Sequence, residues 1–254
     1  MKVAAIQHDI MFEDPAATRA HVTGLIAEAA AVGSRLIVLT EMFDTGFTMR
    51  PEVVAEDEGG PSEQFLIDKA GQHEAWVIAS IAQRGPDGRY RNNAVVAGPD
   101  GSAHRYAKIH PFSYDGEHEH YAAGSDHLTV DIDGMRTSLF ICYDLRFANE
   151  FWEQAPVTDL YVVPANWPEG RRDDWRALLR ARAIENQAYV VGVNRVGIAK
   201  ELAYRGDSAI IDPLGLTLAE ANVGEAVLTA DVAAEAVAKV RAEFPFLRDR
   251  RRCV

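Results

Sequence analysis

The stretch Leu36-Ile37-Val38-Leu39 is apolar at every position, and Tyr189-Val190-Val191 repeats this pattern in the second half of the chain. A strand with one face in water alternates apolar and polar residues, whereas a strand covered on both faces is apolar throughout. These runs therefore predict sheet strands with packing on both sides, which is typical of an α/β fold.

Strand and helix signals alternate along the whole chain. Strands are expected at 3–7, 35–39, 76–81, 93–97, 103–107, 128–132, 136–141, 160–163, 189–193, 208–211, 216–218 and 226–229. Helices are expected at 14–33, around 65–70, from near 145, at 173–186 and after 231, with a loop over 45–60. Each half thus has the approximate order βαβαββ. Two such halves packed sheet on sheet predict a four-layer α-β-β-α sandwich, formed by a single domain of residues 1–254.

The charge balance restricts the class of partner. The 254 residues carry 26 basic and 38 acidic side chains, a net charge of −12, which disfavours binding to nucleic acid or to an anionic membrane. The basic cluster Arg248, Arg250, Arg251 and Arg252 is expected to be a solvated chain end. No stretch of sequence has the length and hydropathy of a membrane span.

The cysteine count and the N-terminus favour a cytoplasmic protein. Cys142 and Cys253 are the two cysteines, which excludes a disulfide framework and fits a reducing compartment. The segment Met1–Gln7 enters a strand directly and lacks the pattern of a signal peptide.

Three reactive side chains each follow a strand-like segment. Glu41 follows Leu36–Thr40, Lys108 follows Arg105–Ala107, and Cys142 begins the polar turn after Phe140-Ile141. A carboxylate, an ammonium and a thiol can act as base, electrostatic partner and nucleophile. The ammonium and a helix N-terminus are expected to bias the thiol toward thiolate. The sequence therefore predicts an enzyme.

Each of these residues also has a structural alternative. A free cysteine is often only packed in a core. The alternative role of Glu41 is to cap the turn that follows it. The alternative for Lys108 is that it is an ordinary surface lysine. His118 and His120 resemble metal ligands, but no distant cluster completes a site, so no metal is expected. No Walker loop or Gly-x-Gly-x-x-Gly turn indicates a nucleotide cofactor.

Taken together, the three segments resemble the nitrilase, or carbon–nitrogen hydrolase, superfamily. Its members carry a Glu-Lys-Cys triad in this chain order on a duplicated α-β-β-α sandwich. The matching motifs are Leu39–Phe43, Tyr106–His110 and Ile141–Phe147. The resemblance implies catalytic roles for Glu41, Lys108 and Cys142, no metal or organic cofactor, and a homodimer or higher homo-oligomer.

Four further motifs are similar to the omega-amidase branch of that superfamily: Ala165–Pro168, Arg182–Val190, Asn194–Gly197 and Tyr204–Ser208. This likeness implies hydrolysis of the terminal amide of 2-oxoglutaramate and 2-oxosuccinamate to the 2-oxo acid and ammonia. It also implies a second glutamate after the lysine. Glu117 fits that role by its place seven residues before Gly124, with Glu119 as the alternative. One departure is Ala148, where many relatives have proline.

The expected substrate pocket is defined more loosely. The backbone N–H of Tyr143 is expected to bind the oxyanion, and Asn166 and Trp167 to line the pocket. Phe43 and Phe47 are candidates for an apolar wall, with loop packing as the alternative. Candidates for binding a distal carboxylate are Arg146, Arg171 and Arg172, although Arg146 has the alternative of a structural ion pair behind the nucleophile.

Several other functions remain open at this point. Within the superfamily they are an aliphatic amidase, an N-carbamoyl amino acid hydrolase, a deaminated-glutathione amidase and a nitrilase. A thiol peroxidase would use Cys142 with Cys253 as the resolving cysteine, but leaves Glu41 and Lys108 without a role. A non-catalytic scaffold has no reason to bury all three reactive groups together.

Overall fold

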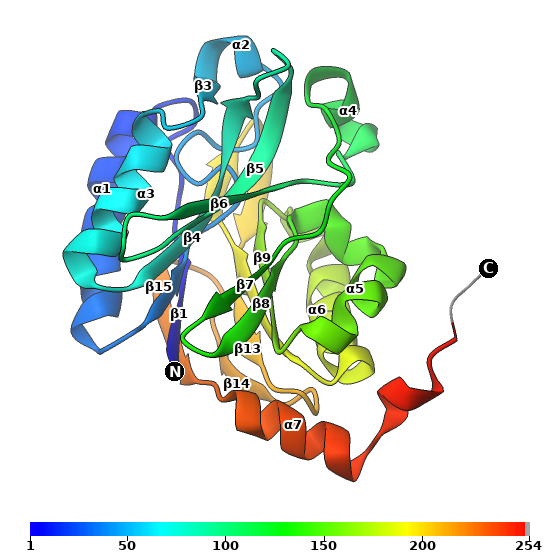
Figure 1. Cartoon of the computed structure of the whole chain (residues 1–254). Helices are drawn as coiled ribbons and strands as arrows, with labels where there is room; N and C mark the ends of the chain where they lie inside the picture. Colours follow the sequence, from blue (N-terminus) through cyan, green and yellow to red (C-terminus); the bar gives the residue numbers. More distant parts are fainter. Residues whose placement is uncertain (252–254) are drawn as a thin grey trace.

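The computed structural model describes residues 1–251 and contains two mixed β-sheets packed face to face (Figure 1). The first sheet has the strand order β15 (Ala226–Asp231), β1 (Lys2–Gln7), β2 (Leu36–Val38), β4 (Trp76–Arg84), β5 (Tyr90–Ala97) and β6 (Ala103–Ala107), with β3 (Glu56–Asp57) beside β4. The second has the order β14 (Thr217–Glu220), β13 (Ala209–Ile211), β10 (Tyr189–Asn194), β9 (Leu160–Ala165), β8 (Met135–Leu139) and β7 (Thr129–Ile132).

Helices cover both outer faces of this pair of sheets. α1 (Pro15–Ala31) and α3 (Pro61–His73) lie on the first sheet, and α5 (Ala148–Gln154) and α6 (Arg172–Asn186) lie on the second, at the left and right of Figure 1. α7 (Ala234–Glu243) runs along the lower end. The predicted four-layer α-β-β-α sandwich is confirmed. Within residues 1–251, no helix is long and apolar enough to cross a membrane. Arg252 and Cys253 lie outside the described residues.

The packing explains why the strands are apolar throughout. Val3 and Ala5 of β1 belong to the core between the two sheets, whereas Ala4 and Ile6 pack toward α1 and α3. All four side chains are fully buried. Successive side chains of a strand point to opposite faces, so a strand covered on both faces needs apolar residues at every position.

The predicted boundaries of α1 are also confirmed. Asp14 caps the helix, since its carboxylate accepts a hydrogen bond of 3.0 Å from the backbone N–H of Ala17, and Pro15 is the first helical residue. The helix ends at Ala31, shortly before Gly33, whose φ of 81° suits a glycine.

One strand does not join the sheet of the half in which the sequence placed it, so the predicted division into two βαβαββ halves is wrong for that strand. β15 follows β14 in the chain, but it joins the first sheet, where it pairs antiparallel with β1 along all six residues of that strand. β14 is the edge of the second sheet, so the chain crosses between the sheets at this edge. The crossing covers an edge of β1 that would otherwise expose unpaired backbone groups.

Two short segments depart from the predicted loops. The stretch 45–60 contains α2 (Pro51–Val54) and β3. The segment after β10 forms the antiparallel hairpin of β11 (Val196–Ala199) and β12 (Leu202–Arg205). The two turn residues of this hairpin, Lys200 and Glu201, have φ values of 48° and 68°. A tight hairpin turn of this kind normally carries Asn or Gly, and that signal is missing here.

Strand direction brings the ends of four strands to one place. β2 is parallel to β4, and two successive antiparallel pairings make β6 run in the same direction. In the second sheet β8 and β9 are parallel. The carboxyl ends of β2 and β6 therefore lie at the same edge of the first sheet, as those of β8 and β9 do in the second.

Candidate active site

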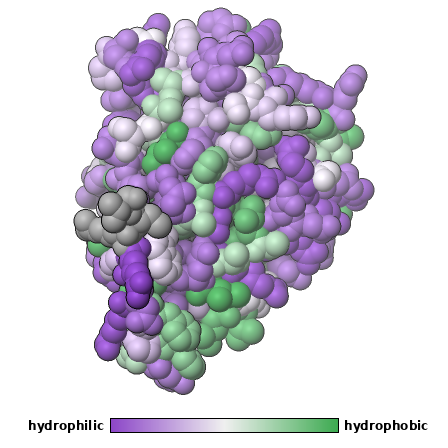
Figure 2. All heavy atoms as spheres, turned by 90° about the vertical axis from the view of Figure 1, so that its right-hand side faces the viewer, coloured by the Kyte–Doolittle hydropathy of each residue, from purple (hydrophilic) through white to green (hydrophobic). Residues whose placement is uncertain are grey.

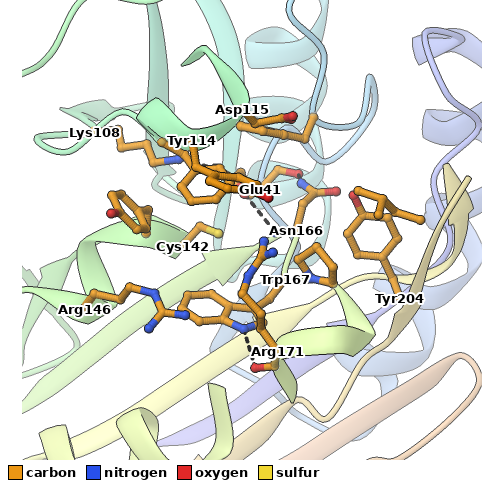
Figure 3. Close-up of a pocket in the computed structure, with 15 residues that line it drawn as sticks. Glu41, Lys108, Tyr114, Asp115, Cys142, Arg146, Asn166, Trp167, Arg171 and Tyr204 are labelled. Carbon is orange, nitrogen blue, oxygen red and sulfur yellow. Dashed lines mark hydrogen bonds and ion pairs between the residues drawn. The ribbon is translucent and has the colours of Figure 1, made fainter. Parts of the chain in front are cut away.

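A cavity of about 260 Å³ lies where these strand ends meet, and Glu41, Lys108 and Cys142 all line it (Figure 3). Glu41 follows β2, Lys108 directly follows β6, and Cys142 begins the 3₁₀ turn η2 (Cys142–Arg146) after β8. The three residues are at most 9% exposed. Residues far apart in the sequence thus form one buried site, which argues against the alternative of a surface lysine.

Glu41 is an acceptor for several donors. Its Oε1 accepts hydrogen bonds from Lys108 Nζ at 2.9 Å and from Asn92 Nδ2 at 2.9 Å, and its Oε2 accepts one from the backbone N–H of Asn166 at 2.8 Å. A fully buried carboxylate is stable only with such partners. The donors hold the carboxylate in one orientation beside the cavity.

Lys108 joins the two predicted glutamates. Its Nζ lies 2.9 Å from Glu41 Oε1 and 2.8 Å from Glu117 Oε2. Burial by itself would lower the pKa of Lys108, but the charges of Glu117 and Glu41 outweigh it and raise that pKa above its usual value. Lys108 is therefore an ammonium, and two of its three N–H bonds are used by the glutamates.

Glu117 is the first residue of the short helix α4 (Glu117–His120) and is fully buried behind Lys108. Besides Lys108, it accepts a hydrogen bond of 2.5 Å from the backbone N–H of Phe112. Burial and the neighbouring Glu41 raise the pKa of Glu117, although the Lys108 charge opposes this shift. Glu119, the alternative second glutamate, is exposed on the same helix.

Cys142 sits at a sharp turn that its neighbours stabilise. Its φ of 45° is in the left-handed region, which non-glycine residues rarely adopt. Buried Asp144 accepts hydrogen bonds from the backbone N–H of Ile141 at 3.0 Å and of His110 at 2.9 Å, and from the Tyr106 hydroxyl at 2.8 Å. The Asp144 carboxylate therefore ties the turn that begins at Cys142 to the segment that carries Lys108.

The expected bias of Cys142 toward thiolate is wrong. Burial, followed by the charge of Glu41, raises the pKa of the Cys142 thiol well above its usual value, and the Lys108 ammonium only partly opposes this shift. The thiol is therefore protonated at neutral pH. The negative charge of Glu41 favours a neutral thiol, and a carboxylate in this position is suited to accept a thiol proton.

Asn92 on β5 belongs to the site but was missed in the sequence. Its Nδ2 donates to Glu41 Oε1 at 2.9 Å and to Glu117 Oε1 at 3.2 Å, and its Oδ1 accepts from Ser80 Oγ at 2.8 Å. Asn92 thus bridges the two carboxylates. The pair Asn92-Asn93 directly before the apolar run 94–97 was the available signal, because a buried polar residue needs a partner.

Replacing Asn92 with alanine is expected to lower kcat by about 10- to 100-fold, the effect of losing hydrogen bonds to charged groups. Without the donor, the pKa of Glu117 rises further, so the acid limb of the pH–rate profile should move to higher pH. The profile of kcat/KM against pH measures this shift. The matched control is Asn93→Ala, since Asn93 bonds Gln83 at 2.9 Å instead. An Asn92→Ala enzyme with an unshifted acid limb would show a purely structural role.

Gly124 lies against the strand end that carries Lys108. Its backbone N–H donates to Lys108 O at 2.8 Å, and an added Cβ would meet the backbone oxygen of Ala107 at 2.3 Å. Gly124→Ala should therefore displace Lys108 and lower both the melting temperature and kcat. Gly24→Ala is the control: Gly24 lies inside α1 with open space around it, so alanine should stabilise the fold by about 0.5–1 kcal/mol. Unchanged activity of Gly124→Ala would contradict this account of Lys108.

The turn after β9 supplies the next part of the cavity. The Asn166 side chain donates from Nδ2 to Glu41 O at 2.6 Å, while its Oδ1 is buried without a partner among the described residues. Asn194 holds this turn in place: its Oδ1 accepts from the backbone N–H of Trp167 at 2.7 Å and its Nδ2 donates to Trp167 O at 2.9 Å. These contacts fix Asn166 and Trp167 in the cavity wall beside Glu41.

The prediction of an apolar wall is confirmed for Phe47 and wrong for Phe43. Phe47 lines the cavity, and its ring centroid lies 5.3 Å from Lys108 Nζ. Phe43 does not line it: the side chain is fully buried under α3, stacked on Phe65 at 5.9 Å. The hairpin residues Leu202 and Tyr204 close another side, a contribution that the sequence did not indicate because the hairpin itself was not predicted.

The remaining candidates lie at different places. Tyr143, Trp167, Arg146 and Arg171 line the cavity, whereas Arg172 does not. Arg172 instead forms a two-pronged pair with Asp207, at 3.0 and 2.6 Å.

The histidines of α4 do not face the cavity. His118 and His120 are exposed. Within residues 1–251, the one group of three side chains close enough to share a metal ion consists of His127, Glu150 and Glu153. None of these three lines the cavity.

Comparison with known proteins agrees with this geometry. Residues 2–242 match the carbon-nitrogen hydrolase family. The chain is 38% identical to the omega-amidase YafV of Yersinia enterocolitica, over 98% of this chain and 96% of that protein. It is 31% identical to the 2-oxoglutaramate amidase of Bacillus subtilis, over 98% and 97% of the two chains.

A solved structure is similar over the whole chain. It is a carbon–nitrogen hydrolase superfamily protein of Xanthomonas campestris with an arsenic adduct in its active site. That structure has a TM-score of 0.94 and 36% identity, and the match covers 100% of this chain and 98% of that one. The family resemblance seen in the sequence is thereby confirmed: the chain belongs to the carbon–nitrogen hydrolase, or nitrilase, family.

Proposed function

We propose that this protein is an omega-amidase. It hydrolyses the terminal amide of small 2-oxo dicarboxylic acid monoamides, such as 2-oxoglutaramate and 2-oxosuccinamate, to the acid and ammonia. The observation that carries the proposal is the buried set of Glu41, Lys108 and Glu117 beside Cys142 in one cavity. Relatives named as omega-amidase and 2-oxoglutaramate amidase, matched along nearly their full length, support the substrate class.

The first half of the reaction forms a thioester. Glu41 takes the thiol proton as the Cys142 sulfur attacks the amide carbon. The tetrahedral oxyanion is bound by the third N–H of the Lys108 ammonium and by the backbone N–H of Tyr143. Glu41 then gives its proton to the amide nitrogen, the carbon–nitrogen bond breaks, and ammonia leaves.

The second half releases the acid. Glu41, a carboxylate again, takes a proton from water as the water oxygen attacks the thioester carbon. The carbon–sulfur bond breaks, and the thiolate regains the proton from Glu41. Glu117 keeps Lys108 in place through both halves, because the two carboxylates hold the ammonium from two sides.

The cavity walls receive the rest of the substrate. Asn166 lines the cavity beside Glu41, where its Nδ2 donates a hydrogen bond to Glu41 O. Trp167 and Phe47 supply apolar walls for the carbon chain of the substrate.

The proposal also includes a homodimer or a larger homo-oligomer in the cytoplasm. Figure 2 shows the side of the molecule on which α5 and α6 lie, where hydrophobic patches interrupt a mostly hydrophilic surface. Ile184 of α6 is 50% exposed and Val157 is 47% exposed. Apolar side chains in such positions are suited to an interface between copies.

Ammonia release tests the proposal when it is compared across amides. Candidate substrates are 2-oxoglutaramate, glutamine, a simple aliphatic amide, deaminated glutathione, an N-carbamoyl amino acid and a nitrile. The expected result is a clear preference for 2-oxoglutaramate with 2-oxoglutarate as the second product. A preference for another amide would assign a different carbon–nitrogen hydrolase activity to the same triad. Carbon dioxide release would indicate a carbamoyl substrate.

A further inference from the structure

The cavity is lined by three cationic side chains, and two of them are already paired. Lys108 is held by Glu41 and Glu117. Arg146 forms an ion pair of 2.6 Å with Asp174, and its guanidinium carbon lies 4.8 Å from the centre of the Trp167 ring. The charges of both cations are therefore already offset by carboxylates of the protein.

Arg171 is different. Among residues 1–251 its guanidinium has no hydrogen-bond acceptor and no acidic partner within salt-bridge distance. Two acidic residues near it in the chain are paired with other arginines: Glu169 with Arg205 at 2.7 Å and Asp174 with Arg146 at 2.6 Å. The side chain of Arg171 points into the cavity in Figure 3.

Backbone contacts fix the position of Arg171. Its N–H donates to Pro168 O at 3.0 Å, and its carbonyl oxygen accepts from Trp167 Nε1 at 2.7 Å. The guanidinium carbon lies 5.3 Å from the centre of the Phe112 ring, whose backbone N–H donates to Glu117. The free donors of Arg171 are therefore held in a fixed position relative to the catalytic residues.

We propose that Arg171 binds the distal carboxylate of the substrate and makes the enzyme selective for amides of dicarboxylic acids. A guanidinium can bind a carboxylate through two parallel N–H···O bonds, which also orient the bound molecule. This inference rests on the omega-amidase proposal. It selects Arg171 over Arg146 and Arg172, because among these three arginines only Arg171 combines a place in the cavity wall with a charge that no carboxylate of the described residues already pairs.

The opposite side of the cavity supports this placement. Asp115 also lines the cavity, but it is exposed and lies away from Arg171 in Figure 3. Its negative charge repels a carboxylate from that side. A substrate whose amide faces Cys142 therefore places its carboxylate toward Arg171.

The test compares two substrates that differ only in the distal group. In 4-oxopentanamide a methyl group replaces the carboxylate of 2-oxoglutaramate. The quantity measured is the ratio of kcat/KM for 2-oxoglutaramate to that for 4-oxopentanamide. Arg171→Gln is expected to lower this ratio about 100-fold, mainly through KM, since the lost bonds are to a charged group. In Arg171→Lys the same ratio should fall by about 10-fold, because lysine keeps the positive charge but lacks the planar guanidinium that donates two parallel hydrogen bonds.

Arg146→Gln is the matched control, since it removes a second guanidinium from the same cavity wall. Its ratio should fall much less, because the charge of Arg146 is already compensated by Asp174. The assignment of Arg171 would be overturned if the kcat/KM ratio stayed at the wild-type value in Arg171→Gln and fell strongly in Arg146→Gln. A wild-type enzyme with no preference for 2-oxoglutaramate would instead refute the omega-amidase proposal. Melting temperatures of the variants verify that the fold is kept.

Discussion

Replacing Cys142 with alanine is expected to abolish ammonia release while leaving the fold intact. The sulfur is the only atom of the protein that forms a covalent bond to the substrate in this mechanism, so no other side chain replaces it. By analogy with other removed nucleophiles, the loss in kcat should be about 10⁵-fold or more. The thiol is buried and protonated and forms no ion pair, so its removal costs little stability. Ammonia release and thermal unfolding measure the two effects.

Cys142→Ser provides the control for size and polarity. A hydroxyl is a poorer nucleophile than a thiol, so this variant should also be almost inactive, even though it keeps a proton for Glu41 to accept. Substantial ammonia release by Cys142→Ala would contradict the nucleophile assignment. Peroxide consumption that requires Cys142, in a protein that hydrolyses none of the amides, would support the thiol peroxidase alternative.

Replacing Glu41 with glutamine is expected to have the second largest effect, a loss in kcat of about 10³- to 10⁴-fold. Glu41 is surrounded by donors: Lys108 Nζ, Asn92 Nδ2 and the backbone N–H of Asn166. An amide keeps the size of the carboxylate but cannot take the proton of a thiol whose pKa is raised. One end of the amide would also direct N–H groups at these donors. Single-turnover kinetics should show that thioester formation itself becomes slow.

Glu117→Gln is the matched control for Glu41→Gln. Both residues are buried carboxylates that bind Lys108, but only Glu41 lines the cavity. The Glu117 variant should therefore form the thioester faster than the Glu41 variant. Equal rates of thioester formation in the two variants would mean that the glutamates only hold Lys108, and would contradict the role of Glu41 as the base.

Much of this fold could be predicted because its strands are buried on both faces. Such strands leave uninterrupted apolar runs, as at Leu36–Leu39, and a charged residue at the end of a run is conspicuous. Glu41, Lys108 and Cys142 were found in this way. That their strand ends converge depends on the parallel directions of β2 and β6, and of β8 and β9, which a duplicated α/β pattern already implies.

Other features of the structure leave no signal in the sequence around them. The hairpin of β11 and β12 turns through Lys200 and Glu201, residues that do not mark a tight turn. Phe43 and Phe47 are four residues apart in one segment, and only packing decides that one faces α3 and the other the cavity. The protonation of Cys142 depends on the balance between burial, Glu41 and Lys108 in three dimensions, and there burial dominates.

Mass spectrometry of the enzyme, quenched in acid during turnover of 2-oxoglutaramate, tests the central claim most directly. The account predicts a 2-oxoglutaryl group on the peptide that contains Cys142, in the wild-type enzyme and more abundantly in a variant with slowed hydrolysis. The group should be absent from Cys142→Ala. Ammonia release without any acyl group on Cys142, or with the group on another residue, would contradict the thioester mechanism.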